Sequence, residues 1–209
     1  MEGPDQYRTL RRAVLAEPPK TKGSRFIGEA FPARTEEQAQ AHLDAVRKRE
    51  HAATHHCWAW RLTPDGSLFR YSDDGEPNGS AGAPIHRQIE GHGLTDVVVV
   101  VTRYYGGTKL GTGGLVRAYG DAAADALALA ERDGLVVTKT VRVPVEVAYA
   151  HADTGAAMQT LARFDALLQD PAYDAEGARV VAAVRASEVA DLEAAWTEAL
   201  AGRGTLTRR

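Results

Sequence analysis

The pattern of apolar and polar positions is strongest at 96–105, where five consecutive valines occupy 97–101. A continuous β-branched run of this kind is typical of a strand buried on both faces. We therefore expect this segment to be the central strand of a sheet. The other elements predicted in this part of the chain are strands near 7–14, 24–31, 53–62 and 67–72 and helices over 36–50, 85–90 and 115–132.

A second pattern begins near residue 139. Its predicted strands cover 141–149, 167–173, 178–186 and 204–207, and its predicted helices cover 153–165 and 187–202. This βαββαβ order is that of a ferredoxin-like sandwich, in which two helices cover one face of an antiparallel sheet. The sequence therefore predicts an α+β protein of two domains, 1–138 and 139–209.

Charge and cysteine content narrow the functional classes. The chain of 209 residues has 25 Lys and Arg against 28 Asp and Glu, so any anion site has to be a local patch. The single cysteine, Cys57, excludes an intramolecular disulfide and a multi-cysteine metal centre, which favours a reducing cytoplasm. No apolar run approaches the roughly 20 residues that span a bilayer, and the first residues lack a secretory layout. We expect a cytoplasmic protein with no membrane partner, no cofactor and no metal.

A glycine-rich segment follows the predicted central strand and precedes a helix. Its candidate anion-binding or partner-binding residues are Arg103, Tyr104, Tyr105, Gly106, Gly107, Lys109, Gly111 and Gly113. Glycines let the backbone approach a ligand, and a helix N-terminus favours anions such as phosphate. The alternative is a tight turn without a ligand, and the segment lacks the Gly-Lys-Ser/Thr ending of a nucleotide-binding P-loop.

A second loop, 72–84, concentrates polar and acidic side chains. Its candidate residues are Asp73, Asp74, Glu76, Asn78 and Ser80. Such groups bind hard cations or act as acid and base, although the spacing is not that of a calcium loop. The alternative is a pair of turns in which the Asp and Asn side chains bond their own backbone.

The cluster of His51, His55, His56 and Cys57 does not predict a metal centre. In an extended strand, His55 and Cys57 point to one face, whereas His56 points to the other with the two tryptophans. We therefore interpret these histidines as structurally satisfied. The chain also lacks the Gly-x-Ser-x-Gly elbow of the α/β-hydrolases.

Several separated blocks of the sequence resemble the YigZ and IMPACT family. They are Ser24-Arg25-Phe26-Ile27, His55-His56-Cys57-Trp58-Ala59, Asp73-Asp74-Gly75-Glu76-Pro77, Gly79-Ser80-Ala81-Gly82, Arg103-Tyr104-Tyr105-Gly106-Gly107 and Lys109-Leu110-Gly111. The resemblance implies a first domain with the α+β fold of a ribosomal-protein C-terminal domain and of the GHMP kinases. It also implies a second domain similar to the ferredoxin-like domains of elongation factors, and it implies no catalytic residue.

The two glycine-rich loops and the family resemblance together predict a non-enzymatic, translation-associated protein. Its two glycine-rich loops would dock RNA, the ribosome or a protein partner. The alternative is an enzyme that acts on a phosphorylated or nucleotide-like small molecule, with Lys109 on the phosphate and Asp74 or Glu76 as base. A third interpretation is a structural adaptor whose aromatic residues only pack the core. If the two loops form one shared site, they have to meet at one cleft.

Overall fold

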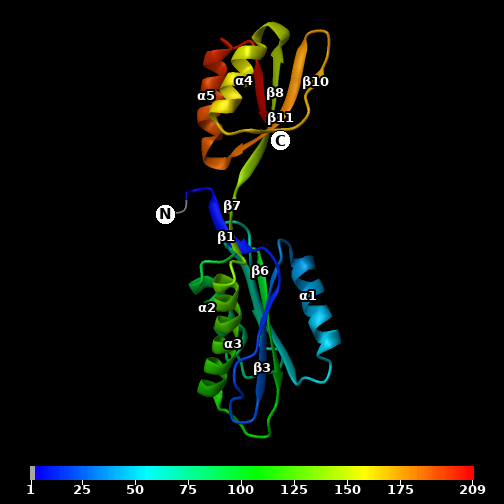
Figure 1. Ribbon diagram of the computed structural model, residues 1–209, viewed down its shortest axis with the longest axis vertical. Helices are drawn as coiled ribbons and strands as arrows, with labels where there is room; N and C mark the ends of the chain where they lie inside the picture. Colours follow the sequence, from blue (N-terminus) through cyan, green and yellow to red (C-terminus); the bar gives the residue numbers. More distant parts are fainter. Residues whose placement is uncertain (1–2) are drawn as a thin grey trace. The chain divides into compact units, whose positions relative to one another are not determined.

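A computed structural model describes residues 3–209, and these form two compact units (Figure 1). The N-terminal unit is Tyr7–Lys139, and the C-terminal unit joins Thr140–Arg209 with residues 3–6. Both units combine helices with antiparallel strands, so the predicted α+β class is confirmed. Residues 1–2, which open the predicted first domain, lie outside the described residues.

The N-terminal unit is built on a five-stranded sheet in the order β2-β3-β6-β4-β5. Its strands are β2 (Val14–Ala16), β3 (Arg25–Pro32), β4 (His55–Leu62), β5 (Leu68–Ser72) and β6 (Val97–Tyr104). Every neighbouring pair in this sheet is antiparallel. A separate pair, β1 (Gln6–Leu10) with β7 (Val136–Thr140), forms a two-stranded sheet.

Strand β6 is buried on both faces, as its valine run predicts. Val97, Val99 and Val101 contact the core beneath α2 (Gly82–Gly91) and α3 (Thr112–Arg132). The valines at the two intervening positions contact the core beneath α1 (Glu36–Arg49). Figure 1 shows α1 on one side of the sheet and the other two helices on the opposite side.

Two helices begin earlier than predicted. Helix α2 begins at Gly82 rather than near 85, because the Asp73 carboxylate accepts the N–H groups of Ala81 and Gly82 and so stabilises the first turn. Helix α3 begins at Thr112 rather than at 115, with the Leu115 N–H bonded to the Gly111 carbonyl. The glycines at 113 and 114 therefore belong to the first helical turn and not to the loop.

The C-terminal unit has the βαββαβ order, with one predicted strand divided in two. Its elements are β8 (Arg142–Ala150), α4 (Thr154–Arg163), β9 (Leu167–Leu168), β10 (Ala172–Tyr173), β11 (Gly177–Arg185), α5 (Val189–Ala199) and β12 (Thr205–Arg208). The strand expected over 167–173 is interrupted near Pro171, which has no N–H to donate to a ladder. The antiparallel sheet order is β10-β11-β8-β12, with β9 also paired to β11.

Among residues 3–209, no helix has the length and the apolar character needed to cross a bilayer.

Gly28 controls how closely helix α3 packs on strand β3. A Cβ at this position would lie 2.1 Å from the Ala122 carbonyl oxygen of α3. We expect Gly28→Ala to lower the free energy of unfolding by about 1–3 kcal/mol, because backbone cannot move aside as a flexible side chain can. Chemical denaturation measures the change.

Gly91 supplies the matched control for this prediction, because it ends α2 in the same unit and a Cβ there would meet nothing within 4 Å. Gly91→Ala is expected to leave the stability unchanged or slightly higher. Equal denaturation midpoints for the two variants would contradict the proposed close packing.

Candidate functional site

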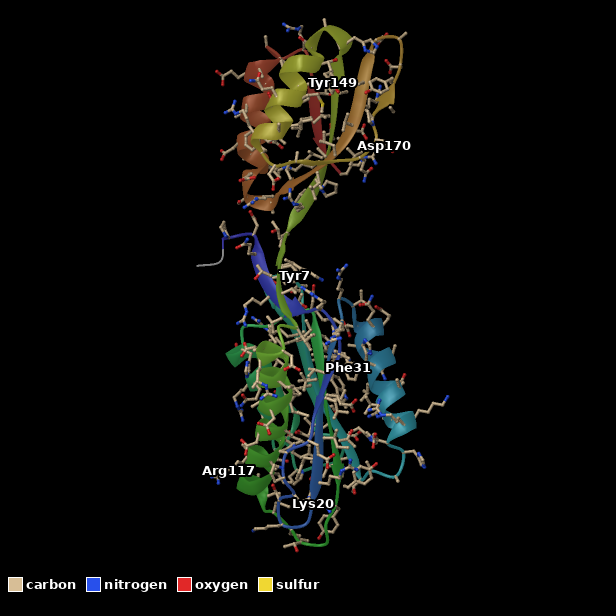
Figure 2. The ribbon with its side chains drawn as sticks, viewed as in Figure 1. Tyr7, Lys20, Phe31, Arg117, Tyr149 and Asp170 are labelled. Carbon is tan, nitrogen blue, oxygen red and sulfur yellow. The ribbon has the colours of Figure 1, made fainter. Side chains whose placement is uncertain are left out.

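The two loops meet at one pocket of the N-terminal unit, with a cavity volume of about 420 Å³. The residues that line it are Thr54, His55, Glu76, Pro77, Arg103, Tyr105, Lys109, Leu110, Gly111, Thr112 and Leu115. They come from the start of β4, the 73–81 loop, the end of β6, the glycine-rich segment and the first turn of α3. Figure 2 shows the side chains of this unit.

A buried ion pair lies between the two loops. Arg103 Nη1 donates to Glu76 Oε1, and the two side chains are only 6% and 5% exposed. The Tyr119 hydroxyl donates to the same carboxylate oxygen at 2.8 Å, and Arg103 Nη2 lies 3.4 Å from Ser24 Oγ. The carboxylate thus connects the acidic loop to the central strand and to helix α3.

Arg103 keeps one unused donor inside the site. Its Nε atom is buried and has no hydrogen-bond partner among residues 3–209. The guanidinium lies between the rings of Phe26 and Tyr105, each with its centroid 5.5 Å from the Cζ atom. Arg103 is one of the residues predicted to bind an anion or a partner, but Glu76 already compensates its charge.

The His55 ring is held in one orientation beside this pair. Strand pairing places His55 directly opposite Arg103. Its Nδ1 lies 2.8 Å from the Asp74 carbonyl oxygen, which only accepts, so Nδ1 carries the hydrogen. The other nitrogen, Nε2, is 3.8 Å from Glu76 Oε1, a separation longer than a hydrogen bond.

The glycine-rich segment presents main-chain donors. The N–H groups of Tyr105 and Gly106 are bonded to the hydroxyls of Thr54 and Ser24. From 107 to 114, the main-chain N–H groups have no acceptor within the described part of the chain. Three of them form the first turn of α3, where the helix dipole carries roughly half a positive charge.

Lysine and arginine side chains come from the glycine-rich segment, from α3 and from the 20–23 loop, where Gly23 approaches Gly106. Lys109 lines the pocket, and Lys20, Lys22 and Arg117 are exposed. Figure 2 places Lys20 and Arg117 near the same end of the N-terminal unit. None of these four residues takes part in an ion pair within 4.0 Å among residues 3–209. We call this set the basic rim.

Most polar side chains of the acidic loop stabilise the conformation of the loop. Asp73 accepts the N–H groups of Gly79, Ala81 and Gly82 at 2.8–2.9 Å. The Ser80 hydroxyl donates to the loop's own backbone, at the carbonyl of residue 77.

Two further residues of this loop also lie outside the pocket. Asp74 pairs with Arg47 and accepts the His56 N–H, whereas Asn78 is exposed. Of the five loop residues singled out from the sequence, only Glu76 lines the pocket.

The remaining predicted residues have structural contacts. The Tyr104 hydroxyl donates to Glu50 at 2.8 Å, and this hydrogen bond lowers the pKa of that carboxyl. Gly106 approaches Gly23 so closely that a Cβ would lie 1.9 Å from its carbonyl carbon. Gly107 and Gly111 have positive φ angles of 86° and 74°, which favour glycine. Gly113 lies in the first turn of α3.

Two buried hydroxyl or thiol groups near the site are neutral. Burial raises the pKa values of the Cys57 thiol and the Tyr119 hydroxyl. Cys57 donates to the Asp73 carbonyl at 3.0 Å, so it is a structural contact and not a thiolate nucleophile at neutral pH. No group of three or more His, Cys, Asp or Glu residues suited to a metal occurs among residues 3–209.

Sequence reasoning missed the role of His55. It placed this side chain on the face shared with Cys57 but gave it no function. The pairing of its strand with β6, which brings it opposite Arg103, depends on tertiary structure. Thr54 and Tyr119 also reach the site through tertiary structure, and no local motif marks them, whereas Thr112 belongs to the glycine-rich segment.

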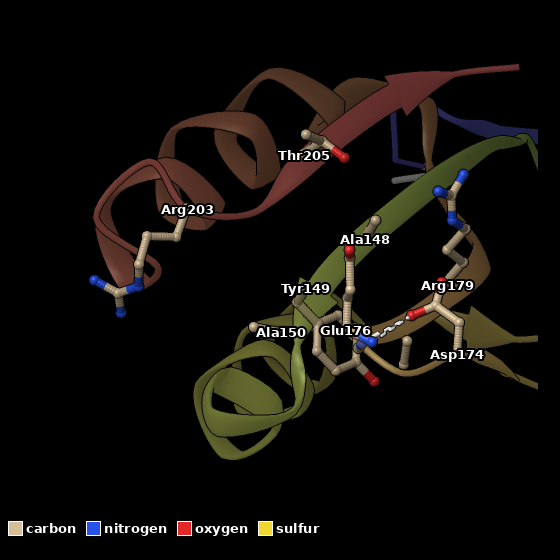
Figure 3. A pocket seen from close by; sticks show the side chains of 10 residues that line it. Ala148, Tyr149, Ala150, Asp174, Glu176, Arg179, Arg203 and Thr205 are labelled. Carbon is tan, nitrogen blue, oxygen red and sulfur yellow. Dashed lines mark hydrogen bonds between the residues drawn. The ribbon is translucent and has the colours of Figure 1, made fainter.

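A second pocket lies in the C-terminal unit (Figure 3). Its cavity volume is about 230 Å³, and small residues of β8 and β11 form much of its lining. Asp174 accepts the Glu176 N–H, and Arg203 pairs with Asp153. Because these polar groups are already bonded, this pocket offers weaker ligand chemistry than the first.

The fold and the site define a class of protein. It has two α+β units, and one unit carries a pocket between an acidic loop and a glycine-rich connection from strand to helix.

Known proteins are similar to this chain in sequence. The Impact N-terminal domain model matches residues 22–127. An IMPACT family member in the pol 5′ region of Thermus thermophilus is 47% identical over 159 residues, 75% of this chain and 81% of that protein. YigZ of Escherichia coli is 47% identical over 108 residues, 51% of this chain and 53% of that protein. The chain belongs to the IMPACT family.

One solved structure extends the similarity to both units. This crystal structure, described as that of a hypothetical protein, has a TM-score of 0.68 and 32% sequence identity. The match covers 97% of each chain.

Removal of Glu76 tests the buried ion pair. Glu76→Ala leaves the Arg103 guanidinium buried without its counterion, and we expect a loss of about 3–5 kcal/mol in the free energy of unfolding. The double variant Arg103→Met with Glu76→Leu should recover part of this loss, since it removes both charges. Denaturant unfolding measures both.

The control is Glu17→Ala, which breaks the exposed pair with Arg25 in the same unit. Its effect should be much smaller because water solvates both partners. Equal losses for Glu17→Ala and Glu76→Ala would be inconsistent with an ion pair that organises the site.

Proposed function

We propose that this IMPACT family member is a cytoplasmic, translation-associated RNA-binding protein. RNA phosphate is the group that the pocket and the basic rim would hold. The observation that carries the proposal is the row of main-chain N–H groups at 107–114 beside Lys109, which have no acceptor in residues 3–209.

The charge distribution supports an anionic ligand. The chain has a formal net charge of −3, yet Lys20, Lys22, Lys109 and Arg117 gather near one end of one unit without ion pairs within the described residues. The start of α3 adds its positive dipole at the same place. A local basic patch on a nearly neutral protein favours binding at that patch over nonspecific coating of nucleic acid.

An aromatic side chain supports RNA as the source of the phosphate. Tyr105 lines the pocket and is 47% exposed. Exposed aromatic rings stack on unpaired bases. The yeast protein IMPACT homolog is 34% identical over 101 residues, which supports the family membership, and the translation-associated role is proposed from the family resemblance.

Salt-dependent RNA binding tests the proposal. We expect Lys22→Ala with Lys109→Ala to weaken the binding of a single-stranded RNA and to reduce the slope of log K against log salt by about 1.4, or about 0.7 for each lost phosphate contact. Fluorescence anisotropy over a salt series measures both quantities.

The matched control is Lys48→Ala, which removes the same charge from an exposed position on α1. It should leave affinity and slope nearly unchanged. The proposal fails if the native chain does not bind RNA at low salt. It also fails if the control weakens binding as much as the double variant; binding to ribosomes without binding to free RNA would favour a protein partner.

A second candidate is an enzyme that acts on a phosphorylated small molecule. The observation that favours it is the placement of His55 and Glu76, two groups able to exchange protons, on the wall of the same pocket as Lys109. The pocket volume of about 420 Å³ lies in the range of small-molecule sites.

A thermal-shift series with mononucleotides and sugar phosphates tests the second candidate. A ligand that binds only the folded chain raises the unfolding midpoint as the ligand concentration rises. At a ligand concentration of 100 times Kd, the free energy of unfolding increases by about 2.7 kcal/mol. Lys109→Ala should abolish the shift, and Lys48→Ala should preserve it. Midpoints that stay constant across the series would count against this candidate.

A further inference from the structure

The His55 ring points a free nitrogen toward the pocket. Its Nδ1–H donates to the Asp74 carbonyl, so ring rotation that would exchange the two nitrogens breaks this bond. Nε2 has no partner within hydrogen-bond distance among residues 3–209, and the side chain is 21% exposed. The proposed RNA contact through Lys109 and the helix amides does not use this nitrogen.

The charges around His55 determine how a bound ligand would affect the protonation of its ring. The charged groups that face it are Glu76 from the acidic loop, Arg103 from β6 and Lys109 from the glycine-rich segment, whereas the Asp74 carboxylate is bonded to Arg47 and to the His56 N–H. Glu76 is compensated by Arg103, and Asp74 is compensated by Arg47. A bound anion would therefore add uncompensated negative charge, which favours the protonated imidazolium and its Nε2–H donor.

The donors left free around the pocket distinguish two kinds of phosphate. Arg103 and Tyr119 both donate to the Glu76 carboxylate, so the free donors are those of His55, Lys109 and the main chain. An internal phosphodiester carries one negative charge and continues in two directions. A terminal phosphate carries up to two charges, and three of its oxygens are available to donors on several sides.

We propose that this pocket takes a terminal phosphate, a phosphate monoester, and that His55 Nε2–H donates a hydrogen bond to it. The inference rests on the proposed function, because it assumes that Lys109 and the α3 amides hold the same phosphate. The 5′ end of an RNA and a free nucleotide both carry this group, and the experiment separates them.

The experiment compares a short single-stranded RNA with and without a 5′-phosphate, at about pH 6.5 and about pH 8. We expect the 5′-phosphate to tighten binding about tenfold at the lower pH, the effect of one charge-assisted hydrogen bond. The advantage should shrink at the higher pH, because a neutral imidazole that keeps its hydrogen on Nδ1 has none on Nε2 to donate. The phosphate itself gains negative charge over this range, so its own titration would act in the opposite direction.

Two variants isolate the histidine. His55→Gln should lose the decrease of the 5′-phosphate advantage at the higher pH. His51→Gln, at an exposed histidine of the same unit, should keep it. Circular dichroism and the unfolding midpoint establish that both variants are folded, and the preserved Lys109-dependent binding of unphosphorylated RNA provides a second check on His55→Gln.

Competition identifies the source of the phosphate. Adenosine 5′-monophosphate and adenosine are each tested as competitors of the 5′-phosphorylated RNA. If only the monophosphate displaces the RNA, a small nucleotide is sufficient to occupy the pocket. Failure of the nucleotide to compete would leave the RNA end as the ligand.

The outcomes separate this inference from the proposed function. RNA binding that depends on Lys109 but not on the 5′-phosphate or His55 would overturn the inference and leave the proposed function standing. Nucleotide binding that depends on His55, with no RNA binding, would overturn the RNA proposal and support the inference. If neither ligand binds, both fail.

Discussion

The buried pair of Arg103 and Glu76 is the constraint on which the rest of the site depends. An uncompensated charge is strongly disfavoured in the interior, so the acidic loop has to bring its carboxylate to the end of β6. The loop in turn needs Asp73, whose carboxylate accepts three backbone N–H groups and aligns the start of α2. The walls of the pocket therefore follow from satisfying charges and backbone donors.

The same pair separates the residues that shape the pocket from those free to contact a ligand. Arg103, Glu76, Asp73 and Tyr119 have internal partners. Lys109, the amides at the start of α3 and His55 Nε2 have none within residues 3–209. A substitution at Arg103 changes stability and site geometry together, whereas one at Lys109 changes the surface charge beside the pocket.

The sequence predicts the fold well because its strongest signals are local. The valine run specifies a strand with two buried faces, and Thr35 supplies a cap for α1 by accepting the Gln38 N–H. Local signals do not locate the start of α2, because its first N–H groups bind Asp73 from the preceding loop. They also do not show that Pro171 divides a strand rather than ending it.

The site was harder to predict because its parts come from strands that pair over long sequence distances. From the sequence, Asp74 and Glu76 are equivalent candidates for the site. In the structure, Asp74 pairs with Arg47 and Glu76 pairs with Arg103. His55 looked like a structural histidine because its neighbours in sequence lie on alternating faces. Its position opposite Arg103 depends on the register between β4 and β6, and a shift of one residue would turn His55 to the other side of the sheet. Since that register also buries Cys57 and Ala59 beneath α2 and α3, the packing of the core determines where the free imidazole nitrogen points.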